Sequence, residues 1–161
     1  MTDLVNPLRG IEFFHDIAQE HLQRITAISK IVEFPAQYDI FHENEPAKDI
    51  YFVISGRVSL AVNTTHAGCR QLMEVGPGEL IGWSPLVGRA LLSDTARTLT
   101  PTVAVALDGG RILKLCAEDP QFGFEFMQRA AQTLASRLNA TRLQLLELGG
   151  LRLPKVQIES D

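Results

Sequence analysis

From Ile31 to Leu107, turn-forming residues divide the chain into short runs rich in β-branched and aromatic side chains. Such runs, bounded by glycine, proline or asparagine, predict strands joined by turns and exclude long helices. Between Val58 and Val62 apolar and polar side chains alternate, which predicts a strand with one buried and one exposed face. The turn-forming residues are Pro35, Asn44, Pro46, Gly56, Gly68, Gly76, Pro77 and Gly78.

Helical patterns flank this strand-rich region. Between Asn6 and Ile31 apolar side chains recur at helical spacing, which predicts a packed N-terminal helix. Two further strands are expected at 95–99 and 102–107. Helix-start signals then follow at Asp108 and at the pair Asp119-Pro120. The expected fold class is therefore α+β, with two helices closing the chain.

The last predicted helix runs from Pro120 to Leu148 and ends at Gly149 and Gly150, where a left-handed glycine stops a helix at little cost. At 1.5 Å per residue it is about 43 Å long, more than a domain of this size needs to cover its core. Its side chains Met127, Ala131, Leu134, Leu138, Thr141, Leu145 and Leu148 follow at alternating spacings of four and three, as in the seam of a two-helix coiled coil. We expect a homodimer through the later turns. The alternative is packing on the strands, as expected for Phe122, Phe126 and Ala130.

Size and charge restrict the classes of partner. The chain has 161 residues, 45% of them apolar, which fits a single domain over 1–150 and a short tail over 151–161. Fifteen basic against 19 acidic residues give a net charge of −4, so no basic surplus favours nucleic acid as a partner. The 13 residues after Leu148 are too few for a helix-turn-helix.

No membrane or export signal is visible. The longest charge-free stretches, 58–69 and 98–107, are shorter than the roughly 20 apolar residues of a membrane span. Residues 1–10 lack a signal peptide, so a cytoplasmic location is expected. Cys69 and Cys116 belong to no metal-binding pair and are interpreted as ordinary thiols, with a disulfide as the alternative.

None of the usual signatures of catalytic sites is present in the sequence. The four histidines, at 15, 21, 42 and 66, have no spacing that would let two imidazoles share a metal ion. The glycines at 76, 78 and 82 are spaced one residue too far apart for a dinucleotide loop and are interpreted as a turn. Ser84 lacks the flanking glycines of a nucleophile elbow, and no P-loop is present. We therefore expect no enzyme activity, no bound metal and no resident cofactor.

Three stretches, in the correct order, carry a resemblance to a known family. They are Tyr38–Ala47, Asp49–Val58, which contains a turn glycine at Gly56, and Val75–Gly82. Together with the order of elements, they resemble the cyclic-nucleotide-binding domain of catabolite-activator-type regulators, protein kinase A regulatory subunits and nucleotide-gated channels. The resemblance runs from about Leu8 to Leu148. It implies a double-stranded β-helix (a jelly roll, or β-roll) with an N-terminal helix and two C-terminal helices.

The resemblance also implies a ligand cassette. In the family, a short helix offers its N–H groups to the cyclic phosphate, an arginine neutralises that phosphate, and a glutamate accepts from the ribose hydroxyl. Here Trp83 stands at the glutamate position and Leu92 at the arginine position, and Arg97 fits the following strand in the same register. The candidate ligand-binding residues are Gly82, Trp83, Ser84, Arg89, Leu92 and Ser93. Trp83 is interpreted as a core aromatic, or alternatively as a platform for a flat ligand.

A shifted register is the alternative. It makes Glu79 the ribose glutamate and Arg89 the phosphate arginine, but it requires three inserted residues before Arg97. In the direct register, two missing charge-assisted contacts remove about 3–6 kcal/mol of binding free energy. This corresponds to roughly two to four decades in affinity.

Two functions remain open. The favoured one is a non-catalytic regulatory module, with both anchoring side chains replaced, that acts in trans as a dimer on an unknown protein partner. The alternative is a working sensor of cyclic AMP or cyclic GMP. It would use Arg89, Ser93 and the cassette backbone, with Thr133, Ser136 or Arg137 closing over the base.

Overall fold

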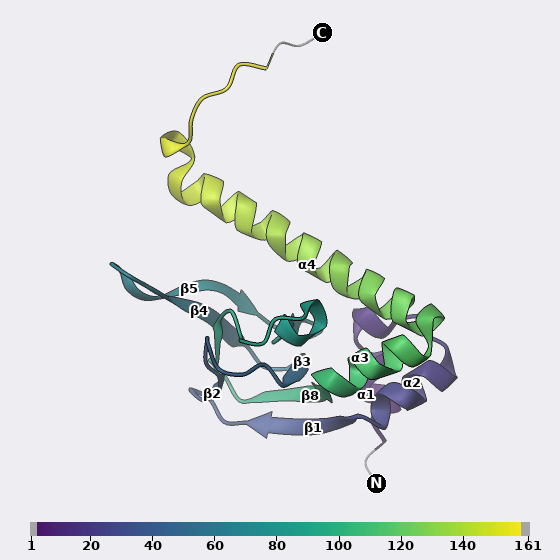
Figure 1. Ribbon diagram of the computed structural model, residues 1–161. Helices are drawn as coiled ribbons and strands as arrows, with labels where there is room; N and C mark the ends of the chain where they lie inside the picture. The colour runs from purple at the N-terminus through teal and green to yellow at the C-terminus, as the bar shows by residue number, and fades with distance from the viewer. Residues whose placement is uncertain (1–2, 159–161) are drawn as a thin grey trace.

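The computed structural model describes residues 3–158, and its strands form two four-stranded antiparallel sheets (Figure 1). One sheet has the strand order β1-β8-β3-β6 and the other has the order β2-β7-β4-β5. The expected β-roll is confirmed, and strands form near 95–99 and 102–107 as predicted. The strands are β1 (Ser29–Phe34), β2 (Asp39–Phe41), β3 (Asp49–Ser55), β4 (Val58–Thr64), β5 (Gly68–Val75), β6 (Leu80–Ile81), β7 (Thr95–Thr98) and β8 (Thr102–Asp108).

Helices lie at both ends of the chain, and one short 3-10 helix follows β6. They are α1 (Val5–Arg9), η1 (Glu12–Phe14), α2 (Gln19–Thr26), η2 (Ser84–Val87), α3 (Gly109–Glu118), α4 (Pro120–Gly149) and η3 (Gly150–Arg152). The tail continues to residue 158, and the last three residues of the predicted tail, 159–161, lie outside the described residues. No helix within residues 3–158 combines the length and apolar character needed to cross a bilayer.

The helical, packed N-terminal segment predicted between Asn6 and Ile31 is confirmed, but it is not a single helix. The segment forms three short helices, because the chain turns after α1 and again at Asp16, whose φ is 62°. The turns allow the adjacent Phe13 and Phe14 both to be buried, with their ring centroids 4.8 and 4.7 Å from that of Phe52 on β3. The spacing of the apolar residues indicates which side chains enter the core, but it does not indicate that the backbone turns between the helices.

The two predicted helix starts are confirmed. The Asp108 carboxylate accepts from the Arg111 amide at 2.9 Å, and the Asp119 carboxylate accepts from the Phe122 amide at 3.2 Å. These contacts satisfy amides that a helix start leaves without an intrahelical partner.

The end of α4 differs from the prediction. The helix stops at Gly149 as expected, but neither glycine is left-handed, with φ of −152° at Gly149 and −55° at Gly150. Because Gly150 keeps a helical φ, the backbone winds on into η3, where the Leu153 amide donates to the Gly150 carbonyl at 3.2 Å.

Two apolar clusters divide the interior. The first joins the terminal helices to β3 and β8 and includes Phe14, Phe52, Phe122, Phe126 and Ala130. These last three α4 residues are buried, so the expected packing of the early turns of α4 on the domain is confirmed. The second cluster fills the roll and consists of Phe41, Val53, Val58, Leu60, Val75, Ile81, Leu92 and Ala96.

Strand β4 departs from the predicted alternation at one position. Ser59, expected on the exposed face, is only 8% exposed, and its hydroxyl donates to the Gln71 side-chain oxygen at 2.6 Å. Gln71 lies on the neighbouring strand β5, and its hydrogen bond satisfies the buried hydroxyl.

Candidate functional site

The predicted cassette begins where β6 ends. Gly82 has a φ of 71°, and the chain then passes through Trp83 into η2, which ends at Gly88, also at a φ of 71°. A Cβ atom at Gly82 would lie 3.1 Å from the Asp49 carbonyl oxygen and 3.3 Å from the Phe41 ring. Glycine is therefore required both for the left-handed backbone and for the close approach of β3.

Gly82→Ala is expected to lower the free energy of unfolding by about 2 kcal/mol, combining left-handed strain with crowding. Gly68→Ala is the matched control, because Gly68 has a φ of 69° but nothing within 4 Å of a built Cβ. It is expected to cost about 1 kcal/mol, from backbone strain alone. Urea denaturation of both variants measures the difference, and equal losses would contradict the contact with β3.

The second half of the cassette pairs with the turn after β2. The Asn44 amide donates to the Leu92 carbonyl at 2.8 Å, and the Leu92 amide donates to the Glu45 carbonyl at 2.9 Å. This pairing directs the Leu92 side chain into the second cluster, where it is 6% exposed and packs with residues such as Phe41 and Leu60. The apolar side chain of Leu92 thus helps to fill the interior of the roll.

The other cassette candidates do not converge. Trp83 is half-buried and packs against the first cluster, and Ser84 is 1% exposed. Arg89 and Ser93 are exposed at the surface. For the shifted register, the Glu79 carboxylate accepts from the Gly76 amide at 2.8 Å, and no hydrogen bond or ion pair joins it to Arg89 in the described structure.

An unpredicted acidic residue, Asp94, lies beside the cassette and is half-buried. Burial raises the pKa of its carboxyl, the Arg137 guanidinium opposes that rise, and Glu43 adds to it. Arg137 reaches over from α4 and donates to the Leu80 carbonyl oxygen of β6. Burial lowers the pKa of this guanidinium, against the effect of Glu79 and Asp94. A charge between two inward-facing residues, Leu92 and Ala96, was the only sequence signal for Asp94.

The α4 candidates line a separate cleft of about 750 Å³ between α4 on one side and η1, the end of β5 and the turn that follows β5 on the other. Thr133, Ser136 and Arg137 lie there with Glu79, whereas none of the candidates from Gly82 to Ser93 does. The Thr133 hydroxyl donates to its own helix, at the Arg129 carbonyl 3.1 Å away.

Carboxylates dominate the lining of this cleft, with Glu12, Glu74, Glu79 and Glu125 against two arginines. Both arginines are engaged. Arg129 donates to the Phe13 carbonyl at 2.6 Å and to Glu125 at 2.9 Å, and Arg137 donates to Leu80. Of the two arginines, Arg129 is paired with a carboxylate, and Arg137 donates to a backbone carbonyl.

The fold and the cassette define the class of protein. The sequence model of the cyclic nucleotide-binding domain matches residues 31–119, and the chain belongs to this family. It is 25% identical over 135 residues to a CRP-like cAMP-activated global transcriptional regulator of Mycobacterium tuberculosis, covering 84% of this chain and 58% of the relative. It is 30% identical over 143 residues to the cyclic AMP receptor protein of Thermus thermophilus, covering 88% of this chain and 61% of the relative.

The chain thus spans about three-fifths of these curated relatives. Among solved structures, the crystal structure of a cyclic nucleotide-binding domain from Methylobacillus flagellatus superposes with a TM-score of 0.79. It covers 96% of this chain and 85% of that one at 19% identity, a likeness of fold alone.

Proposed function

We propose that this chain is a non-catalytic regulatory domain that keeps the fold of its family but does not bind cyclic nucleotides in the family's usual manner. The main support for this proposal is the burial of Leu92. Its side chain lies in the apolar interior of the roll, where the resemblance places the phosphate arginine. A cyclic phosphate there would lose hydration without gaining an ionic partner.

The charges around the cassette support the same proposal. The electrostatic field beside the cassette has contributions from three carboxylates, those of Glu43, Glu79 and Asp94. The Arg137 guanidinium interacts electrostatically with the last two. Arg137 donates to the Leu80 carbonyl, and this contact joins α4 to β6. An anionic ligand would therefore meet net negative charge.

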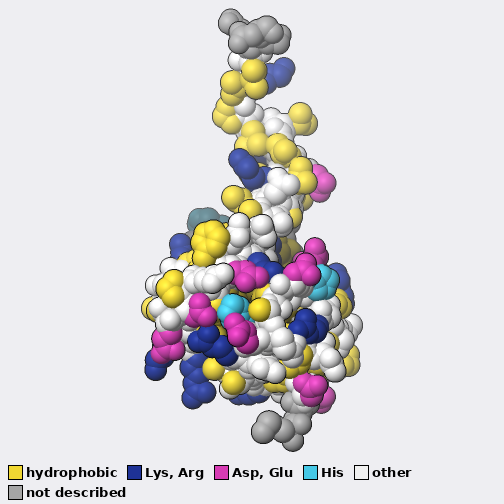
Figure 2. Space-filling view, turned by 90° about the vertical axis from the view of Figure 1, so that its right-hand side faces the viewer, with side chains coloured by type: hydrophobic (Ala, Val, Ile, Leu, Met, Phe, Trp, Pro, Cys, Tyr) yellow, Lys and Arg dark blue, Asp and Glu magenta, His cyan; other side chains and the backbone are white. Residues whose placement is uncertain are grey.

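Regulation is proposed to act in trans in the cytoplasm, through a homodimer built on the later turns of α4. Beyond its packed first half, this helix projects from the body of the domain with apolar side chains on its surface (Figure 2). Leu138, Leu145 and Leu148 are 59%, 55% and 79% exposed. Met127, the first residue of the predicted seam, packs instead against the first cluster.

A cyclic AMP or cyclic GMP sensor is the second candidate. One observation favours it: Arg89 is exposed and forms no ion pair within residues 3–158, so its guanidinium is available to an anion at the cassette surface. The two relatives, a cAMP-activated transcriptional regulator and a cyclic AMP receptor protein, have this function by name.

Titration of wild-type protein with cyclic AMP and cyclic GMP separates the two. Trp83 is the single tryptophan, and its emission reports directly on the cassette. We expect no saturable change up to millimolar ligand, and no heat of binding by calorimetry. Free tryptophan at matched absorbance controls for light absorbed by the nucleotide. A saturable change at micromolar ligand that Arg89→Ala abolishes would establish the sensor instead.

A further inference from the structure

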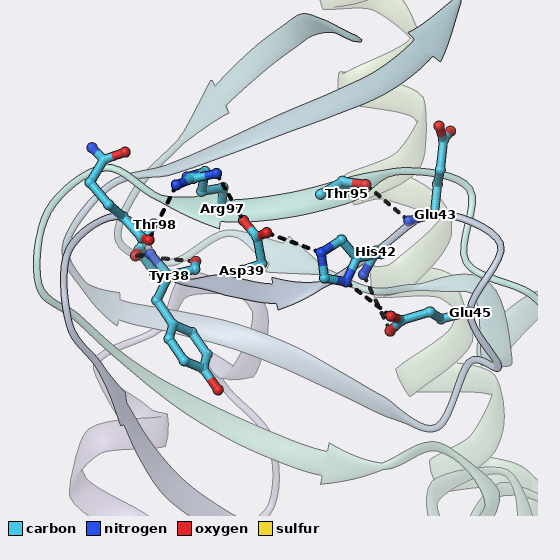
Figure 3. A network of polar contacts seen from close by, with 9 residues as sticks. Tyr38, Asp39, His42, Glu43, Glu45, Thr95, Arg97 and Thr98 are labelled. Atoms are coloured by element: carbon cyan, nitrogen blue, oxygen red, sulfur yellow. Dashed lines mark hydrogen bonds and ion pairs between the residues drawn. The ribbon is translucent and has the colours of Figure 1, made fainter.

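His42 lies between two carboxylates on the surface of the roll, at the end of β2 (Figure 3). Its Nδ1 is 2.9 Å from a Glu45 carboxylate oxygen, and its Nε2 is 3.0 Å from an Asp39 carboxylate oxygen. The Glu45 carboxylate also accepts from the His42 backbone amide at 3.4 Å. One imidazole thus bridges β2 and the turn that follows it.

This geometry requires a protonated ring. Neutral imidazole has one N–H donor and one lone pair, whereas the imidazolium has two donors. An ionised carboxylate only accepts hydrogen bonds, so a neutral ring would direct a lone pair at one of the two oxygens. The pKa of His42 is accordingly raised above 6.5, first by the hydrogen bond to Asp39, then by that to Glu45, with their charges adding to it.

The remaining charged groups nearby do not replace either bridge. Arg97 on β7 lies 3.5 Å from the other Asp39 oxygen. Glu43 turns its carboxylate to β4, where it accepts from the Asn63 amide at 2.7 Å, and its own amide donates to the Thr95 hydroxyl at 3.0 Å. A neutral His42 keeps one N–H and therefore donates to only one of the two carboxylates: Asp39 has Arg97 as a second partner, whereas His42 is the only side-chain partner of Glu45 in residues 3–158.

The bridged turn is the same one that holds the cassette. The Glu45 amide donates to the His42 carbonyl at 3.3 Å, and the turn is completed by Asn44 in a left-handed conformation, with a φ of 67°. The turn pairs with Leu92 through the amides of Asn44 and Leu92, and the Ala47 amide donates to the Ala90 carbonyl at 2.9 Å. The backbone that fixes Leu92 is therefore directly attached to the His42 bridge.

We propose that His42 is a proton-dependent clamp: its imidazolium ties β2 to the turn that pairs with Leu92, and loss of the proton loosens this side of the cassette. Because the folded-state pKa is raised, the clamp is complete below the ordinary histidine value of 6.5 and is lost as pH rises through the folded-state pKa. This device goes beyond the proposed function and needs no nucleotide.

Nuclear magnetic resonance titration of the nucleotide-free, ¹⁵N-labelled protein tests the clamp. The His42 ring is expected to titrate with a midpoint above 6.5. The backbone amides of Asn44, Ala47 and Leu92 are expected to shift with the same midpoint. In His42→Gln this inflection is expected to disappear from the three amides, because the titrating group is gone.

Two further variants separate the clamp from a general effect of charge. Glu45→Gln is expected to lower the His42 midpoint and shrink the Leu92 shift, and it serves the same purpose if His42→Gln does not fold. Glu33→Gln, which removes an exposed carboxylate on β1, is the matched control and is expected to change neither. A midpoint at or below 6.5, or amides at Asn44 and Leu92 that do not follow the ring, would overturn the proposal.

Discussion

The double variant Trp83→Glu with Leu92→Arg is expected to bind cyclic AMP about two to four decades more tightly than the wild-type protein. The new guanidinium supplies charge-assisted hydrogen bonds to the cyclic phosphate, and the new carboxylate accepts from the ribose hydroxyl. At roughly 1.5–3 kcal/mol each, the two contacts add about 3–6 kcal/mol of binding free energy. Isothermal titration calorimetry of both proteins measures the difference.

Folding has to be checked alongside binding, because Leu92 is buried and an arginine there carries its charge into the apolar interior in the absence of ligand. Circular dichroism and thermal unfolding, with and without nucleotide, identify the folded fraction. Leu92→Met is the matched control, since it keeps an apolar side chain of similar volume and is expected to gain no affinity. A folded double variant that binds no better than wild type would show that these two positions do not decide nucleotide binding.

The elements that follow local rules were predictable from the sequence. The starts of α3 and α4 rest on one aspartate each, and the same contacts occur in the structure. Strands β7 and β8 follow from short runs of β-branched residues between turns. At the two helix starts the deciding hydrogen bond joins residues three positions apart.

The N-terminal segment shows where such rules fail. Apolar spacing records which side chains are buried, and it cannot distinguish a straight helix from three short ones folded over the same core. The left-handed backbone at Asp16 is one of the points where the chain turns. Aspartate tolerates this conformation but also occurs in many others, so its presence in the sequence does not predict the turn.

The candidate site also has a part that the sequence could predict and a part that it could not. The candidates Trp83 and Leu92 could be assigned by counting from Gly82, because the cassette is one continuous stretch of sequence. The approach of Arg137 to β6 could not, since its partner is the backbone carbonyl of Leu80, which has no sequence signature. The pairing of Leu92 with the turn at Asn44 and Glu45 is also made through main-chain groups. Long-range contacts to the backbone decide the chemistry of this region, and residue types do not record them.

Leu138→Asp is expected to convert the proposed homodimer to monomer at concentrations where the wild-type protein is fully dimeric. Leu138 is 59% exposed in the single chain, and a two-helix seam would bury it in both copies. Removing two buried leucines costs roughly 1.5–3 kcal/mol each, or about 3–6 kcal/mol per dimer. The dimer dissociation constant rises by about two to four decades, before repulsion between the two new carboxylates is counted. Sedimentation velocity over a range of concentrations measures it.

Leu143→Asp is the matched control, because Leu143 is equally exposed, at 54%, on the same turns of α4. At 100° per residue it points away from the seam formed by Leu138, Thr141 and Leu145. The same change of charge and hydropathy there is expected to leave the dimer intact. Equal dissociation of both variants would mean that any exposed leucine of α4 contributes to association, as expected for non-specific association and not for a defined seam. A wild-type protein that sediments as a monomer would contradict the proposed coiled-coil dimer, and the exposed leucines of α4 would then be expected to contact a different protein.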